Sequence, residues 1–205
     1  GTLQQWLAMP ALSGAALTRD DGRWVTLTRG AIPGAGSWTH QYGNPANTAC
    51  SDDQHVRCPL GLLWLGNPGP GSMLNRHVRA ASPVSSEGRA FIQGENAVLG
   101  YDIYNGMQLW ERRIPGAGRP NASHDASNFA VSPSGLFLGV GAECLRLDPA
   151  TGATLASYKV SPAPGGFQRW GWIAAAGNRL YGSRASGAGM SDAILAMDTD
   201  TGKTA

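Results

Sequence analysis

The chain has 205 residues, among them 29 glycines, 13 prolines and 7 tryptophans, and only 15% of its residues are charged. The formal net charge is +2 and the basic residues are scattered, which excludes the usual electrostatic surface for nucleic acid and a polybasic membrane patch. No apolar run reaches the roughly 18 residues of a membrane span. No stretch shows helical apolar spacing, so this profile is typical of an all-β protein with many turns.

The first 59 residues form a lead-in to the repeats that follow. Two short apolar strands are predicted, Leu3–Met9 and Trp24–Thr28, with a turn at residues 20–22. Residues 31–59 are rich in Gly, Pro and Asn, and predict a long ordered connection that lies across one face of the domain.

Three cysteines are present. Cys50 and Cys58 lie in one loop, at a spacing that could close a small disulfide in an exported protein. A metal site built from these two residues and His55 is the alternative, but a second ligand pair at zinc spacing is absent. Cys144 lies in a predicted strand and is expected to be a small buried apolar residue.

One turn pattern occurs three times after residue 60. Each copy has a short apolar strand, an Asp, three residues, a Gly and a new strand, and the Asp residues lie 46 and 50 positions apart. The Asp side chain can accept hydrogen bonds from nearby backbone N–H groups, and Gly supplies a positive φ, so each copy predicts a tight hairpin. The flanking strands repeat as well, and this period is typical of solenoids, propellers and arrays. The turn residues are Asp102 and Gly106, Asp148 and Gly152, and Asp198 and Gly202.

These residues resemble the docking motif of the pyrroloquinoline-quinone-like, or quinoprotein-like, β-propellers. The family includes quinoprotein alcohol dehydrogenases and an outer-membrane-assembly propeller lipoprotein. The resemblance implies four-stranded antiparallel blades, with a Trp after each turn packed between neighbouring blades. Trp110 follows the first turn, whereas Ala156 stands at the Trp position after the second. Residues 38–48 and Leu62–Trp64 resemble the lead-in of such propellers, and residues 38–183 resemble large exported propellers of planctomycete-type bacteria.

The resemblance predicts a partial β-propeller of about three to four blades within a single domain. Residues 60–125 are expected to form one blade, residues 126–166 a second and residues 167–205 an incomplete third, with a loop inserted at Ser183–Asp192. A closed propeller needs at least about four blades. We therefore expect the chain to be a fragment of a larger bacterial propeller protein.

Polar residues gather where the chain leads into the second and third blades. In propellers such positions line the central channel, where an Arg pairs with a carboxylate and an indole stacks on a ring. The alternatives are a solvated loop whose Asn and Asp cap turns, and Trp residues that pack in the core. The candidate ligand-binding residues are Arg119, Asn121, His124, Asp125, Asn128, Arg169 and Trp170.

Two functions are compatible with these observations. One is a non-catalytic binding or scaffold module of the bacterial cell envelope, periplasmic or exported as the resemblance implies, with a protein partner or a small ligand at a propeller face and no evident cofactor. The other is a quinoprotein-like oxidoreductase, in which pyrroloquinoline quinone (PQQ) with calcium oxidises an alcohol or sugar. The adjacent cysteine pair that covers the quinone in the dehydrogenase branch is absent from this sequence.

Overall fold

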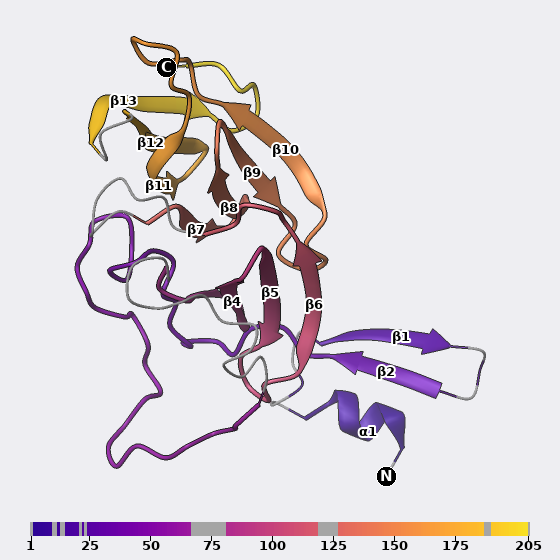
Figure 1. Cartoon of the computed structure of the whole chain (residues 1–205). Helices are drawn as coiled ribbons and strands as arrows, with labels where there is room; N and C mark the ends of the chain where they lie inside the picture. Colours follow the sequence, from indigo (N-terminus) through magenta and orange to yellow (C-terminus); the bar gives the residue numbers. More distant parts are fainter. Residues whose placement is uncertain are drawn as a thin grey trace.

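The computed structural model describes residues 2–9, 12, 15–20, 22, 24–66, 81–118, 127–186 and 190–204. Nearly all regular structure in these residues is antiparallel β-sheet, arranged as four separate sheets (Figure 1). The predicted all-β class, with blades of a partial propeller, is therefore confirmed.

The three larger sheets follow one another along the chain as blades 1, 2 and 3. Each is a simple meander, because every connection joins two neighbouring strands. Blade 1 consists of β3 (Val84–Ser86), β4 (Arg89–Gly94), β5 (Ala97–Asp102) and β6 (Gln108–Arg113). Blade 2 consists of β7 (Phe129–Ser132), β8 (Gly135–Val140), β9 (Glu143–Leu147) and β10 (Thr154–Lys159). Blade 3 has three strands, β11 (Trp170–Ala176), β12 (Arg179–Ala185) and β13 (Ser191–Asp198).

The N-terminal segment differs from the prediction. Leu3–Met9 does not form a strand, because Leu3–Leu7 is the short helix α1. A capping box explains this: the Thr2 hydroxyl accepts the N–H of Gln5, and the Gln5 side chain accepts the N–H of Thr2. The predicted strand Trp24–Thr28 is present as β2, which pairs with β1 (Ala16–Asp20), and this hairpin projects from the side of blade 1 (Figure 1).

The loop predicted at Ser183–Asp192 is shorter in the structure. Ser183 pairs with Ile194 and Arg184 with Ala193, so β12 and β13 continue into the Gly- and Ser-rich stretch. The Arg184 guanidinium binds the Asp192 carboxylate at 2.8 Å and holds the two strands together at this point.

Two apolar clusters fill the spaces between blades. The first contains Phe91 and Val98 of blade 1 with Phe129 and Leu136 of blade 2. The second joins blades 2 and 3. Successive side chains of β8 alternate between the two clusters, since Leu136 belongs to the first and Phe137 to the second. Blade 2 is therefore buried on both faces, as a middle blade of a propeller must be.

The three predicted turns share one geometry. In each, the Asp carboxylate accepts the N–H of the residue two positions on, at 2.8 Å in the first two turns and 3.0 Å in the third. The Gly N–H donates to the backbone oxygen of the Asp, and the Gly has a positive φ between 69° and 74°. These local bonds make the turn independent of its surroundings.

An aromatic side chain from the preceding segment docks on each turn. The Trp110 Nε1 donates to the Pro149 backbone oxygen at 3.0 Å, and its ring covers Gly152. The Trp64 Nε1 donates in the same way to Ile103, the residue after Asp102, at 2.7 Å. Residues 62–66 therefore occupy the same position relative to blade 1 that β6 occupies relative to blade 2.

The third docking residue is Tyr158 and not a residue at position 156. Its hydroxyl donates to the Thr199 backbone oxygen at 2.6 Å. Position 146 explains the change. Trp110 packs on Gly100, where even a Cβ would lie 2.5 Å from the indole, but the matching residue of blade 2 is Arg146. A Trp at position 156 has no room against this arginine.

The segment Trp38–His40 crosses the inner strands of all three blades. The N–H of Ser85 in β3 donates to the Trp38 oxygen at 2.8 Å, and the N–H of Val131 in β7 donates to the Thr39 oxygen at 3.0 Å. The N–H of Ala175 in β11 donates to the His40 Nε2 at 3.0 Å. All three donors occupy the same position, one residue before their strand ends, so this segment pairs with the inner edge of the propeller.

Candidate functional site

Four of the predicted ligand-binding residues, Arg119, Asn121, His124 and Asp125, lie outside the described residues. Asn128 is wholly buried. Its Nδ2 donates to the Gly118 oxygen at 3.0 Å and the Gly139 oxygen at 2.7 Å, and its Oδ1 accepts the Gln93 side chain at 3.4 Å. All three polar contacts are within the protein, so Asn128 ties blade 2 to blade 1 at this depth.

Trp170 belongs to the core. It is 1% exposed, its ring lies over Gly182, and its Nε1 donates to the Tyr158 oxygen at 3.0 Å. Trp170 and Asn128 both lie against Gly139, but neither faces an open space. Arg169 is half-buried, and its backbone oxygen accepts the N–H of Ala185. Asn128 and Trp170 thus make structural contacts, and the predicted ligand site as a whole stays a prediction.

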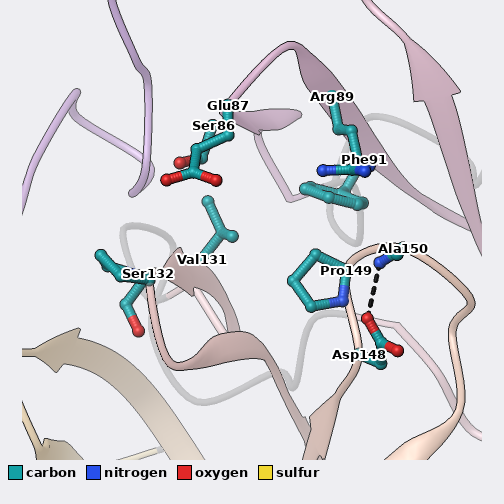
Figure 2. Close-up of a pocket in the computed structure, with 10 residues that line it drawn as sticks. Ser86, Glu87, Arg89, Phe91, Val131, Ser132, Asp148, Pro149 and Ala150 are labelled. Carbon is teal, nitrogen blue, oxygen red and sulfur yellow. Dashed lines mark hydrogen bonds between the residues drawn. The ribbon is translucent and has the colours of Figure 1, made fainter. Parts of the chain in front are cut away.

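A different site lies between blades 1 and 2, at the end of the sheets where β3 turns into β4 and β7 into β8. It is a cavity of about 190 Å³, here called the first groove. Figure 2 shows Glu87 and Ser86 on one side and Arg89 on the other, with Val131 and Pro149 between blades. Its described lining residues are Ser86, Glu87, Arg89, Phe91, Val131, Ser132, Pro133, Asp148, Pro149 and Ala150.

The charged groups of the first groove differ in how they are bound. Both oxygens of the Asp148 carboxylate are engaged in its own turn, by the N–H of Ala150 at 2.8 Å and the hydroxyl of Thr151 at 3.0 Å. Glu87 and Arg89 form no ion pair or side-chain hydrogen bond with any described residue. A negative and a positive group thus remain available to a ligand in this cavity.

Glu87 occupies an unusual backbone position. With Gly88 it forms the two-residue turn between β3 and β4, and their φ values are 49° and 75°. Such a turn favours Asn, Asp or Gly, because other residues are strained at positive φ. A glutamate here therefore costs stability, which points to a role for its carboxylate. Sequence reasoning missed this residue; the signal available was a charged pair on both sides of Gly88.

Arg89 also lines two neighbouring cavities. One, of about 380 Å³, lies toward the β1–β2 hairpin and includes Arg29. The other, of about 200 Å³, includes Leu63 and Tyr104. The hairpin of β3 and β4 is therefore flanked by hollows on several sides.

The segment Arg57–Gly66 contributes Leu63 to the smaller of these two cavities. From Arg57 to Gly66 no residue makes a backbone–backbone hydrogen bond within the described part of the chain, and the side chains around Trp64 face solvent. The exposed side chains of this apolar strip are Leu60, Leu62, Leu63 and Leu65, each 73% exposed or more.

The cysteines do not form the predicted disulfide in the structure. Cys50 and Cys58 are free and exposed, in a loop whose backbone is held by Asp53 and not by a cross-link. Cys144 is buried as predicted, and burial raises the pKa of its thiol. In the described ranges no three His, Cys, Asp or Glu side chains lie close enough together to hold a metal ion. The helix in the described part is too short to cross a membrane.

No family model and no curated protein matches the sequence. Several solved structures do match the chain. BamB from Moraxella catarrhalis is 17% identical, over 89% of this chain and 54% of that one, with a TM-score of 0.48. A europium-containing methanol dehydrogenase is 17% identical, over 82% of this chain and 31% of that one, with a TM-score of 0.59. A quinohemoprotein alcohol dehydrogenase from Comamonas testosteroni is 16% identical, over 60% and 20%, with a TM-score of 0.47.

The chain therefore spans 54% and 31% of the first two structures that it matches. At these identities the likeness concerns the fold. Together with the meander blades, the Asp-to-Gly turns and the docked aromatics, it leads to one assignment: the chain has the blade fold of the pyrroloquinoline-quinone-like β-propellers.

Proposed function

We propose that the chain is part of a non-catalytic β-propeller module of the bacterial cell envelope, where it holds a protein partner through the apolar strip at residues 60–65. The periplasmic or exported location is proposed on the basis of the family resemblance. The observation that carries the proposal is the strip itself: four leucines in six residues, each 73% exposed or more, on an extended backbone.

The strip combines two properties of a strand that lacks a neighbour. Its backbone N–H and C=O groups form no backbone–backbone hydrogen bond within the described residues. Its exposed leucines come before and after Trp64 in the sequence. Trp64 anchors the segment by its bond to Ile103, so the strip is held in place before a partner arrives. An anchored extended segment with unpaired backbone is suited to strand addition, in which a partner contributes the free edge of a β-sheet.

The test is site-specific photo-crosslinking in the full chain, produced in the envelope of a bacterial host that carries the partner. A photoreactive residue replaces Leu63 or Leu65 in turn, and Leu155, exposed on β10, serves as the matched control. We expect one defined adduct from the strip positions that is lost when Leu62→Pro removes an N–H and bends the strand. No adduct, or the same adduct from position 155, contradicts the proposal.

The second candidate is a quinoprotein-like oxidoreductase. The observation that favours it is the likeness in fold to methanol dehydrogenase, whose TM-score of 0.59 is the highest of the three structures described above. Titration with PQQ and Ca²⁺, followed by dye-linked oxidation of alcohols and sugars, separates the two functions. An absorbance change on titration together with substrate-dependent dye reduction would favour the enzyme, and neither is expected from the binding module.

A further inference from the structure

We propose that the first groove binds a small α-amino acid with an apolar side chain, in its zwitterionic form. The ammonium group pairs with Glu87, the carboxylate pairs with Arg89, and the side chain lies on the apolar floor between blades 1 and 2. This inference rests on the proposed binding function, but it uses a site separate from the apolar strip.

The charges set the chemistry of the ligand. Glu87 and Arg89 are two residues apart on one hairpin, yet no oxygen of one lies within 4.0 Å of a nitrogen of the other. Figure 2 shows them on opposite sides of the groove. A ligand that carries both a cation and an anion pairs with both groups at once, whereas a simple anion or cation pairs with only one of them.

The floor sets the character of the side chain. Pro133, Pro149 and Ala150 line the groove and are not buried, so they form its accessible apolar surface, whereas Phe91 and Val131 are closed to solvent. Asp148 does not disturb this arrangement, because both of its oxygens are already engaged in the turn. An aliphatic side chain therefore gains burial here without stranding a polar group.

The volume sets the size. A cavity of about 190 Å³ holds about six water molecules at roughly 30 Å³ each. Alanine, valine and proline are of this order, and a tryptophan is too large to fit.

The junction between blades 2 and 3 is bridged by an arginine. There the Arg146 side chain reaches across, with Nε donating to the Ser134 oxygen at 2.7 Å and Nη1 to the Thr199 oxygen at 3.1 Å. The matching residue of blade 1 is Gly100, and there the Trp110 indole takes the place of an arginine side chain, with its Nε1 on the Pro149 oxygen.

The experiment is isothermal titration calorimetry of the full chain with L-valine, its methyl ester, N-acetyl-L-valine and L-tryptophan. We expect saturable binding of L-valine. Binding weakens at least about tenfold for the ester and the acetylated form, since each leaves one charged residue of the groove unpaired. Tryptophan should not bind.

Two variants test the residues, and two are matched controls. Glu87→Gln and Arg89→Gln remove the charges without changing the backbone preference of the turn, and each should weaken L-valine binding at least about tenfold. Glu95→Gln and Arg113→Gln remove exposed charges elsewhere on blade 1 and should bind as the native chain does.

The inference is overturned by absence of saturation at about 10 mM L-valine, or by equal affinity of Glu87→Gln and the native chain. Photo-crosslinking at Leu65 distinguishes this failure from failure of the proposed function. An intact adduct without amino-acid binding removes only the inference about the groove, and a missing adduct with amino-acid binding removes only the strip as partner site.

Discussion

The hydroxyl of Tyr158 lies 2.6 Å from the backbone oxygen of Thr199, the residue that follows the Asp of the third repeated turn. This hydrogen bond joins blade 2 to blade 3, just as the hydrogen bond of the Trp110 indole to Pro149 joins blade 1 to blade 2. Tyr158 stands two positions beyond the Trp position of the motif, so its side chain leaves the same face of β10 as Ala156.

Removal of this hydroxyl should weaken the contact between blades 2 and 3. Tyr158→Phe is expected to lower the free energy of unfolding by about 1 kcal/mol, because the Thr199 oxygen keeps the Arg146 contact but loses a buried donor. Urea denaturation measures the loss. Tyr181→Phe, on an exposed tyrosine of β12, is the control and should change stability by less than about 0.5 kcal/mol.

Positions 146 and 156 should be energetically coupled. Ala156→Trp alone is expected to destabilise the chain, because Arg146 occupies the place of the indole. With Arg146→Gly the new indole gains the kind of surface that Gly100 gives Trp110, so the double variant should be more stable than the sum of the single effects predicts, by about 1 kcal/mol or more. A double-mutant cycle in urea that shows no coupling would contradict this explanation of the missing Trp.

Gly152 should be more sensitive to substitution than Gly141. Both have positive φ, 73° and 56°, so Ala at either position costs about 1 kcal/mol in backbone strain. At Gly152 the added Cβ would also lie 2.7 Å from the Trp110 ring, whereas nothing lies within 4 Å at Gly141. Gly152→Ala should therefore lose about 1 to 3 kcal/mol more than Gly141→Ala. Equal thermal unfolding midpoints would mean that the docked indole is not tightly packed.

His40 should make the fold sensitive to acid. Burial lowers the pKa of its imidazole to about 4, from an ordinary value of 6.5. Since the Nε2 accepts the N–H of Ala175, the Nδ1 carries the proton and faces the Thr39 hydroxyl, 2.8 Å away. Protonation of the Nε2 would remove the acceptor for Ala175.

The sign of this effect follows from the lowered pKa of His40. As pH falls below 6.5 the unfolded chain binds the proton first, so stability is complete above 6.5 and declines toward pH 4, by on the order of 2 to 3 kcal/mol. Urea denaturation at several pH values measures the slope. His40→Gln keeps an acceptor without titrating, and it should flatten the slope between pH 6.5 and 4; an unchanged slope assigns the acid sensitivity to other groups.

The thiols should divide into two classes. Cys50 and Cys58 are exposed and free, and Cys144 is buried with a raised thiol pKa. A thiol reagent should therefore label two cysteines in the folded chain and a third only after denaturation. No labelling of the folded chain would instead support the disulfide predicted from the sequence.

The repeated turns could be predicted because their bonds are local. Asp148 binds an N–H two residues away, and Gly152 follows at a position that needs positive φ, so the segment from Asp148 to Gly152 contains the whole turn. The same reasoning failed at Leu3–Met9, where apolar content suggested a strand and the capping box of Thr2 and Gln5 formed a helix. Within the candidate site, the burial of Asn128 and Trp170 could not be predicted locally, because it depends on neighbouring blades; the site as a whole stays a prediction.

The sequence by itself determined the class of fold, the period of the blades and the place of each Asp-to-Gly turn, since these depend on interactions a few residues apart. Only the tertiary structure decided that Tyr158 replaces a Trp, that Trp38–His40 lines three inner strands, and that Glu87 and Arg89 face an open groove. Those relationships join residues on different blades, and the Ala175 N–H and the His40 imidazole are 135 residues apart. No local pattern records which distant groups will meet when sheets pack around a common axis.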